Sequence, residues 1–215
     1  MDDSHYIASG AERDVYQHPD DPAKLLKVMR NIENAPTRFT FRDISTKLFP
    51  SARLRLIRKE YDEYLRIRLF NPAHDVRLPI THLYGVVSTT RGLACVTERV
   101  SGPDGSVAET MRTMLNKGTF TQVELDLFNG FVDQMHSFGI RAGDLKPHNL
   151  VFGYRDNGYE CVLVDGFGDI HFLPVRSIGR WANALGLNDS FKIVAKRTGL
   201  RWDRKKRRFH LAASD

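Results

Sequence analysis

Two short motifs separated by an apolar stretch constrain the fold of this chain more than any other feature. The first is Asp144-Leu-Lys-Pro-His-Asn149, and the second is Val164-Asp165-Gly-Phe-Gly168. Either motif alone is weak evidence, because Pro147 and the pair Asp165-Gly166 are also typical of ordinary turns. The order of the two motifs and the elements predicted around them therefore decide the interpretation.

The residues around the motifs predict a helix, a loop, a hairpin and a second loop, in that order. Residues 121–138 have apolar side chains at nearly helical spacing, and Thr121 with Glu124 forms a capping box at their start. Two short buried strands are predicted next, over 150–152 and 161–164, with a hairpin turn at Asp156-Asn157-Gly158. Each motif thus falls in a loop that follows a regular element.

This arrangement resembles the catalytic loop and the metal-binding loop of the protein kinases. Phosphoryl transfer needs a carboxylate to receive the proton of the acceptor hydroxyl, and side-chain oxygens to hold Mg²⁺ against the triphosphate of ATP. The pattern predicts Asp144 as the catalytic carboxylate, and Asn149 with Asp165 as metal ligands. Lys146 is predicted to place a positive charge near the transferred phosphoryl group.

A lysine for the nucleotide phosphates is predicted in the N-terminal part of the chain. Residues 6–17 predict two strands around the turn Ser9-Gly10, and Leu25–Met29 predicts a third, apolar strand that carries Lys27. A lysine in an apolar run is unfavourable unless its ammonium group finds a partner or reaches water. Lys27 is therefore either a phosphate-binding residue or an edge-strand lysine, and the downstream motifs favour the first interpretation.

The partner of Lys27 is predicted on the following helix, over residues 53–70. Glu60 lies beside the apolar stripe of this helix and is the first candidate for an ion pair with Lys27, and Glu63 is the second. Both glutamates can instead be charges of a solvated face, paired with basic neighbours at helical spacing. The predicted stripe consists of positions 54, 57, 61, 64, 65 and 69.

Two further strands and a short helix are predicted between this helix and the first motif. The strands are predicted over 81–88 and 93–100, and the helix over 106–116. On the kinase-like pattern, Glu98–Val100 is the hinge that offers backbone groups to adenine. Residues 30–52, with two prolines and mixed charge, predict an irregular insertion.

The chain as a whole resembles the protein-kinase-like superfamily, and most closely the small bacterial group of PhoP-regulatory-network YrbL-type proteins. The resemblance extends over about residues 6–185. The residues that carry it are Ser9-Gly-Ala-Glu-Arg-Asp-Val-Tyr16, His18–Pro22, Lys27, Arg58-Lys-Glu60, Tyr84-Gly85, Gly143–Asn149 and Val164–Gly168.

The resemblance implies an α+β, two-lobed protein-kinase-like fold in a single domain over residues 1–215. A small antiparallel-sheet N-lobe is expected over about 1–100, a reduced and mainly helical C-lobe over about 101–200, and a basic tail over about 201–215. The resemblance also implies ATP and Mg²⁺ as the cofactors of a phosphotransferase whose acceptor is unidentified. The residues assigned to ATP are Gly10, Lys27, Glu60, Glu98 and Val100.

Three departures from the kinase pattern leave the acceptor and the activity open. The phosphate loop has one glycine, Gly10, where the pattern has three, so the backbone is expected to approach the phosphates less closely. Gly143 replaces the arginine before Asp144, so control by a phosphorylated activation loop is not expected. Only 50 residues follow Asp165, so most of the peptide-docking region is expected to be missing. The acceptor is a protein, the chain itself or a small molecule; the alternative is a nucleotide-binding regulatory pseudokinase with little or no turnover.

Hydropathy and cysteine content predict a cytoplasmic protein without a transmembrane segment. The chain has no run of 18 apolar residues, and its first residues lack the character of a signal peptide. Cys95 and Cys161 fall in predicted buried strands, where they are expected to be core residues rather than a disulfide or a metal site. The histidines at 136, 148 and 171 show no metal-ligand spacing.

The net charge of +6 is concentrated near the C-terminus. Residues 196–210 hold eight basic residues and a single acidic one, so the rest of the chain is close to neutral. A helix is predicted over 188–199, beginning at Asn188, Asp189 or Ser190. The run 201–208 is predicted to project into water because it is too charged to be buried. Such a run is either a solvated end or a contact for a polyanion, namely nucleic acid, a membrane surface or an acidic protein.

Overall fold

The computed structural model describes residues 5–10, 13–30, 51–72, 76–156, 158–168 and 180–211. These residues group into two compact units, of which the first lies within 1–61 and 82–99 and the second within 62–81 and 100–215. The segment 62–81, which was expected in the N-lobe, therefore groups with the second unit. The first unit contains a five-stranded sheet, and the second contains a three-stranded and a two-stranded sheet.

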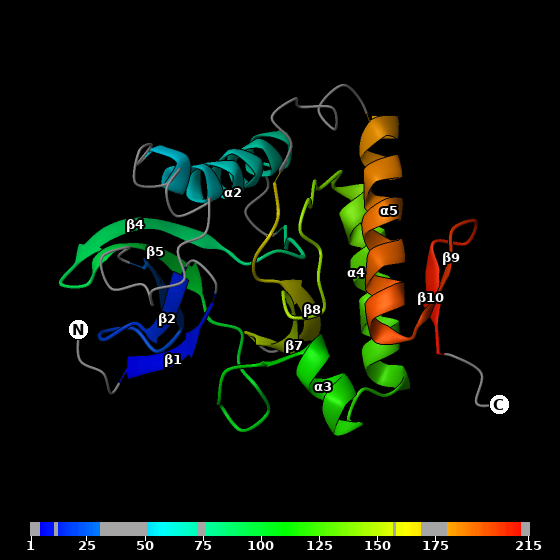
Figure 1. Ribbon diagram of the computed structural model, residues 1–215, viewed down its shortest axis with the longest axis horizontal. Coiled ribbons are helices and arrows are strands. Elements are labelled where there is room, and N and C mark those ends of the chain that lie inside the picture. The colour runs from blue at the N-terminus through cyan, green and yellow to red at the C-terminus, as the bar shows by residue number, and fades with distance from the viewer. Residues whose placement is uncertain are drawn as a thin grey trace, which may run out of the picture. The chain divides into compact units, whose positions relative to one another are not determined.

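The first unit is built on a five-stranded antiparallel sheet in the order β1-β2-β3-β5-β4 (Figure 1). Apolar side chains that alternate along the strands meet in a small core made of Tyr16, Leu26, Val28, Ala94 and Val96. The strands are β1 (Tyr6–Ser9), β2 (Arg13–Gln17), β3 (Lys24–Met29), β4 (Leu83–Thr89) and β5 (Gly92–Glu98). The strands predicted from the sequence in this part of the chain are thereby confirmed.

Helix α2 (Ser51–Phe70) is present where it was predicted, but it buries only part of the predicted stripe, at Ile57 and Tyr64. Leu54, Leu65 and Leu69 of the predicted stripe are exposed. The buried positions are instead 57, 60, 63, 64 and 67, so the inward face includes Glu60 and Glu63. Hydrophobic periodicity missed this face because it counts a carboxylate as polar, although a buried carboxylate is tolerated once cations and donors satisfy it.

The second unit contains a three-stranded antiparallel sheet of β6 (Glu109–Thr110), β7 (Leu150–Arg155) and β8 (Gly158–Leu163). The predicted β7–β8 hairpin is confirmed, and Asn157 of its turn lies outside the described residues. Helix α3 (Met111–Lys117) starts later than the predicted 106–116. The reason is that β6 pairs with β7, and that the hydroxyl of Thr110 then caps the helix by accepting from the N–H of Thr113.

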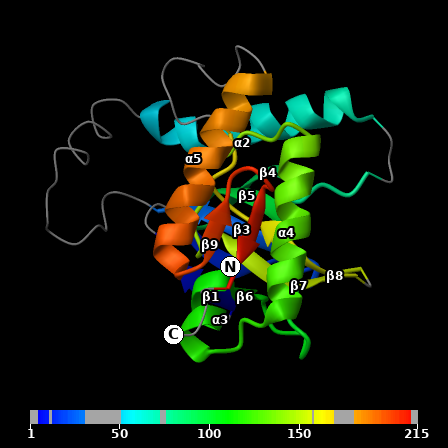
Figure 2. The ribbon, with the colours of Figure 1, turned by 90° about the vertical axis from the view of Figure 1, so that its right-hand side faces the viewer.

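Two long helices, α4 (Gln122–Ser137) and α5 (Arg180–Thr198), also belong to this unit (Figure 2). The predicted capping box at the start of α4 is confirmed. Helix α5, in contrast, begins well before the predicted starts at 188–190. Asn188 and Ser190 lie inside the helix, where they are buried and hydrogen-bonded to Trp202 and to the carbonyl of Ala142. Asn188 and Ser190, which the sequence suggested as helix caps, therefore make tertiary hydrogen bonds instead.

The C-terminal segment is a folded hairpin and not the solvated run predicted for 201–208. Strands β9 (Arg201–Asp203) and β10 (Arg208–His210) pair antiparallel, and they lie beside α4 and α5 (Figures 1 and 2). Phe209 is 1% exposed, and its ring centroid lies 4.6 Å from that of Phe128 and 4.7 Å from that of Trp202. Two aromatic side chains therefore anchor a strongly basic segment, while the charged residues of its turn, 204–207, stay exposed.

Both cysteines are free and buried, and burial raises the pKa of each thiol. The expectation that Cys95 and Cys161 are core residues is thereby confirmed. In the described parts of the chain, no three His, Cys, Asp or Glu side chains are grouped to hold a metal ion; His171 lies outside these parts. None of the helices described has the length and hydropathy of a membrane crossing.

Candidate active site

The first motif forms the loop between α4 and β7, and its polar side chains contact one another. The two carboxylate oxygens of Asp144 lie 2.6 Å and 2.8 Å from Nζ of Lys146. Asn149 is buried, and its Nδ2 donates to the carbonyl oxygen of Asp144 at 2.9 Å. Since the amide nitrogen is used in this bond, Oδ1 is the atom of Asn149 that can ligate a cation. Among the described residues, none donates a hydrogen bond to this oxygen.

The second motif follows β8, and backbone hydrogen bonds join it to the first. Its Phe167 is fully buried, whereas Asp165 stays partly exposed. Because the bonds are made by the backbone, the two loops are held together whatever their exposed side chains do. The bonds run from Val164 N–H to Asn149 O (2.9 Å), Asp144 N–H to Gly166 O (3.1 Å), Gly143 N–H to Gly168 O (3.1 Å) and Gly168 N–H to Arg141 O (2.8 Å).

Gly166 is the point of closest approach between the two loops. Its φ is +82°, in the region that residues with a side chain rarely adopt. A Cβ atom at this position would lie 2.6 Å from the carbonyl oxygen of Asp144 and 3.0 Å from Nδ2 of Asn149. Gly166 is thus required for the contact that orients Asn149.

Replacing Gly166 with alanine is therefore expected to destabilise the protein and to impair binding of Mg²⁺. The unfavourable backbone region alone costs roughly 1–2 kcal/mol, and the contact with the Asp144 carbonyl adds to it. Urea unfolding and calorimetric titration with Mg²⁺ and a non-hydrolysable ATP analogue measure the two effects. Gly130→Ala is the matched control, since Gly130 lies inside α4 with nothing within 4 Å of an added Cβ. An equal effect of the two substitutions would contradict the close-approach argument.

The first unit holds Lys27 and Glu60, the two residues predicted to pair. Lys27 is buried on β3, between Val15 of β2 and Cys95 of β5. Both carboxylate oxygens of Glu60 accept from the guanidinium of Arg13, at 2.8 Å and 3.0 Å. The charges of Arg13, Glu60 and Lys27 all act on the thiol of Cys95, whose pKa is raised chiefly by burial. Arg13 lies two residues before Val15 and so shares a face of the sheet with Val15 and its register partner Lys27, and Glu60 contacts this Arg13.

Arg13 is a residue of this cluster to which the sequence analysis assigned no role. Its side chain is buried although it carries a permanent charge, and it lies on the same face of β2 as Val15 and opposite to the core residue Tyr16. A buried arginine requires an acidic partner, which is a physical reason to look for a carboxylate near β2. The partner is 47 residues away in the sequence, so the pattern of the strand alone did not identify it.

Glu63, the second candidate for a partner of Lys27, belongs to the second unit and has other partners. Its carboxylate accepts from Nε of Arg141 at 2.6 Å, from the backbone N–H of Arg141 at 2.7 Å and from Arg66 at 2.6 Å. Glu63 is 1% exposed, so these hydrogen bonds satisfy a fully buried charge. Arg141 directly precedes the loop of the first motif, and Glu63 thereby fixes the start of that loop.

The remaining residues predicted to bind ATP lie at turns and strand ends. Gly10 follows β1, and its N–H donates to the carbonyl of Arg13 at 2.8 Å. Glu98 ends β5, and both its N–H and its carboxylate are hydrogen-bonded to the backbone of His82. In the second unit, Val100 is buried, and its carbonyl accepts from the N–H of Ala108.

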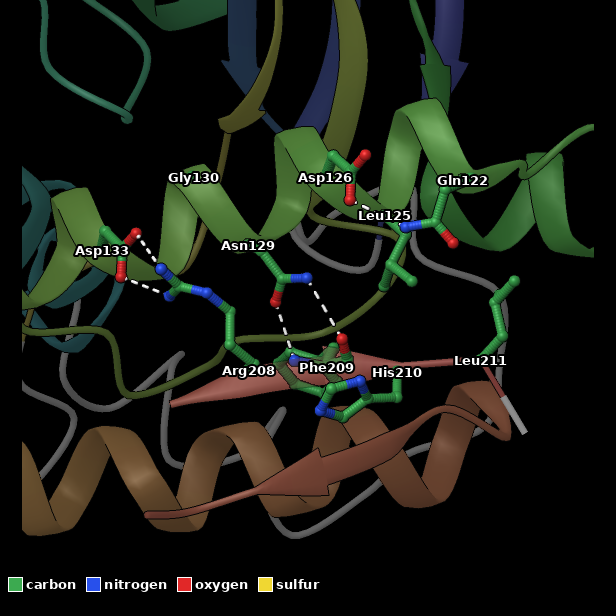
Figure 3. Close-up of a pocket in the computed structure, with 10 residues that line it drawn as sticks. All are labelled: Gln122, Leu125, Asp126, Asn129, Gly130, Asp133, Arg208, Phe209, His210 and Leu211. Carbon is green, nitrogen blue, oxygen red and sulfur yellow. Dashed lines mark hydrogen bonds and ion pairs between the residues drawn. The ribbon is translucent and has the colours of Figure 1, made fainter. Parts of the chain in front are cut away.

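A pocket of about 490 Å³ lies where β10 meets α4, and none of the predicted site residues line it (Figure 3). Its polar groups bind one another. Asn129 donates to the carbonyl and accepts from the N–H of Phe209, and Asp133 forms a bidentate ion pair with Arg208 (Figure 3). Because these contacts attach the hairpin to α4, we interpret the pocket as a gap in the interface between the hairpin and α4 and not as a ligand site.

The architecture of the two units is that of a protein-kinase-like fold of the α+β class. Among solved structures, WbdD is similar with a TM-score of 0.50 and 11% sequence identity, over 88% of this chain and 37% of that chain. The chain thus spans well under half the length of WbdD. A PknI kinase domain from Mycobacterium tuberculosis gives a TM-score of 0.46 and 17% identity, over 94% of this chain and 74% of that chain. A search of curated protein sequences gave no match.

The chain belongs to the family described as PhoP regulatory network protein YrbL, which matches residues 1–199. The resemblance predicted from the two motifs is confirmed for both the superfamily and this family. The match ends before β9, so the C-terminal hairpin lies beyond the part of the chain that the family description covers.

Proposed function

We propose that the protein is an ATP- and Mg²⁺-dependent phosphotransferase that transfers the γ-phosphoryl group to a hydroxyl of its acceptor. The observation that carries the proposal is the set of backbone hydrogen bonds that joins the loop of Asp144, Lys146 and Asn149 to the loop of Asp165. A general base, a cation for the phosphoryl group and two metal ligands are the groups that this reaction needs.

The residues of the two loops suit Mg²⁺, which prefers hard oxygen ligands and usually keeps several waters. Oδ1 of Asn149 and the carboxylate of Asp165 supply two oxygens, and the bond from Nδ2 of Asn149 to Asp144 orients the first of them. Bound Mg²⁺ would neutralise charge on the phosphates. Asp144 orients the acceptor hydroxyl and takes its proton, and Lys146 offers its charge to the transferred group.

In the same proposal, the other residues assigned to ATP bind the rest of the nucleotide. Lys27 binds the α- and β-phosphates, and Glu60 holds Lys27 in position. The glycine turn at Gly10 approaches the phosphates, and backbone groups of Glu98 and Val100 bind adenine. The free thiols of Cys95 and Cys161 agree with a reducing compartment, and we propose a cytoplasmic location on this ground.

Two substitutions in the loops are expected to separate metal binding from acceptor activation. Asp165→Asn removes a charged metal ligand and is expected to abolish Mg²⁺-dependent turnover and to weaken Mg²⁺-dependent ATP binding. Asp144→Ala removes the base and is expected to leave nucleotide binding largely intact while abolishing transfer. Calorimetry with ATP and Mg²⁺, together with release of labelled phosphate, measures both effects. A wild-type protein that does not bind ATP in the presence of Mg²⁺ would overturn the proposal.

The sparse phosphate loop favours a second candidate, a nucleotide-binding regulatory protein with negligible turnover. This loop has only the one glycine, Gly10. Incubation with labelled ATP separates the candidates. Binding without hydrolysis, self-labelling or transfer to cell extract supports the regulatory protein, and any transfer that depends on Asp144 supports the enzyme.

The turn of the C-terminal hairpin is proposed to bind a polyanion. Arg204, Lys205, Lys206 and Arg207 are exposed there, while the carboxylate of Asp203 accepts from the backbone N–H groups of Lys205 and Lys206. Lys205→Gln/Lys206→Gln is expected to elute from heparin at lower salt than the wild type, because charge contacts weaken with screening.

The control for this prediction is Lys117→Gln/Lys192→Gln, which removes the same net charge from α3 and α5. Both control lysines already have acidic partners, Glu109 and Asp189. Elution of the two double variants at the same salt concentration would show that the hairpin turn is a solvated surface with no specific role in binding a polyanion.

A further inference from the structure

Side chains from two other helices hold the segment that leads from α4 into the loop of Asp144. We call residues 139–142 the support segment; it and its contact residues belong to the second unit. Three of its four backbone carbonyls accept from side chains of α2 and α5. These bonds run from Arg66 Nη2 to Gly139 O (2.8 Å), from Asn183 Nδ2 to Ile140 O (3.3 Å) and from Ser190 Oγ to Ala142 O (3.3 Å). The conformation of the support segment is therefore set by tertiary contacts.

The fourth carbonyl of the support segment connects it to the second motif. The carbonyl oxygen of Arg141 accepts from the N–H of Gly168 at 2.8 Å, and Ala142 forms bridges to the same loop. In the chain, the support segment is separated from Asp144 by a single residue. A displacement of the support segment would thus shift the loop of Asp144 and the loop of Asp165 together.

The carboxylate of Glu63 is bound to both the backbone and the side chain of Arg141 in the support segment. One oxygen accepts from the N–H of Arg141 at 2.7 Å, and the other accepts from Nε of Arg141 at 2.6 Å. Arg66 donates to the same carboxylate at 2.6 Å and also to the carbonyl of Gly139. Since Glu63 is 1% exposed, it cannot contact a nucleotide or an acceptor, and it acts only through the residues that it holds.

We infer that Glu63 and Arg66 are positioning residues for the proposed phosphotransferase reaction, and that they hold Asp144 in place through the support segment. The inference rests on the proposed function. Asp144 takes the proton of the acceptor hydroxyl only within hydrogen-bond reach of it, while the acceptor oxygen bonds to the γ-phosphorus of ATP and ADP leaves. A misplacement of about 1 Å in such a site can slow the reaction by roughly a hundredfold. Two residues that lie outside both motifs are therefore expected to control the rate.

Hydrogen exchange of backbone amides measures this positioning without any activity. The N–H of Asp144 binds the carbonyl of Gly166, and the N–H of Gly168 binds that of Arg141. Both amides therefore report on the contact between the two loops. Glu63→Gln is expected to speed the exchange of both by about tenfold or more, because it weakens a charge-assisted hydrogen bond to the backbone of Arg141.

Glu160→Gln is the matched control for this variant. Glu160 is also a poorly exposed carboxylate between two arginines of the second unit, Arg77 and Arg155. None of these three residues belongs to the support segment or to either loop. Glu160→Gln is therefore expected to leave the exchange rates of the Asp144 and Gly168 amides within about twofold of the wild type.

Arg66→Gln is a second test, which decides the question if the buried Glu63→Gln substitution prevents folding. Arg66 is 29% exposed, and its replacement removes the bond to Gly139 together with one cation beside Glu63. Its control is Arg77→Gln, since Arg77 is 41% exposed and also binds carboxylates and a backbone carbonyl. The same faster exchange is expected for Arg66→Gln, and no change is expected for Arg77→Gln.

Turnover of ATP separates a positioning role from a purely structural one. With water as the acceptor, each transfer releases ADP and inorganic phosphate, and labelled phosphate gives the kcat and the KM for ATP. Glu63→Gln and Arg66→Gln are expected to lower kcat by about tenfold or more and to change the KM by less than about threefold. A purely structural role would lower the urea midpoint of unfolding without this split between kcat and KM.

Equal exchange rates or equal kcat values in the variants and their controls would overturn the positioning role, and so would a KM that rises as much as kcat falls. Calorimetric titration of the wild type with ATP and Mg²⁺ tests the proposed function by itself. A wild type that binds no ATP overturns the proposed function, and with it the role of Glu63 and Arg66 in a reaction. Where the wild type binds ATP without releasing phosphate, the exchange rates alone decide. Binding and turnover of ATP that persist unchanged in both variants overturn the positioning role alone.

Discussion

Replacing Phe209 with alanine is expected to lower the free energy of unfolding by about 3–5 kcal/mol. The side chain is 1% exposed and contacts the rings of Phe128, Phe191 and Trp202, with centroid distances of 4.6 Å, 5.8 Å and 4.7 Å. Its removal leaves a cavity in the aromatic cluster that attaches the hairpin to α4 and α5. Urea unfolding followed by circular dichroism measures the change.

Leu211→Ala is the control for this prediction, because Leu211 is 46% exposed at the end of the same hairpin. A change within about 0.5 kcal/mol is expected there. A Phe209→Ala protein as stable as this control would show that the hairpin contributes nothing to the fold. For the same reason, a truncation after Leu200 is a poor test of the basic turn, since it also removes Trp202 and Phe209 from the cluster.

Replacing Arg13 with glutamine is expected to cost a similar amount, about 3–5 kcal/mol, because it leaves the buried carboxylate of Glu60 without its bidentate partner. The side chains of Arg13 and Glu60 are only 5% and 4% exposed, so water cannot replace the lost hydrogen bonds. The expected result is a lower urea midpoint together with weaker binding of Mg²⁺ and ATP, since Glu60 is proposed to position Lys27.

The double variant Arg13→Gln/Glu60→Gln distinguishes a lost charge pair from lost packing. Two neutral amides of similar size can hydrogen-bond to each other, so the double variant is expected to recover much of the stability lost in Arg13→Gln. It is expected to bind nucleotide poorly all the same, because the carboxylate near Lys27 is gone. The stability losses of the single variants Arg13→Gln and Glu60→Gln would have to add up to the loss of the double variant if the buried pair were not coupled.

The two motifs and the elements around them were predictable because their signals are local. Thr121 and Glu124 lie three residues apart, and their capping box forms as predicted. The loop of Asp144 and Asn149 lies between α4 and β7, the loop of Asp165 follows β8, and backbone bonds join the two loops. The roles of these residues in catalysis remain predictions for the experiments above.

The partners of buried charges were not predictable in this way, because they join residues far apart in the sequence. Glu60 pairs with Arg13 across 47 residues, and Glu63 with Arg141 across 78. As a result, α2 buries Glu60 and Glu63 while Leu65 and Leu69 of the expected apolar stripe are exposed. A carboxylate can be buried in this way once its hydrogen bonds are satisfied.

The C-terminal segment shows the same division between sequence and tertiary structure. Its charge is evident from the sequence, and the exposed turn of residues 204–207 agrees with it. What the charge pattern did not reveal is that Trp202 and Phe209 face one another across the hairpin and enter the aromatic cluster beside α4 and α5. Local composition determined which side chains of this segment stay in water. Only the packing of distant elements decided that its backbone folds into a hairpin, because burial of the two aromatic rings outweighs the entropy cost of ordering a short basic segment.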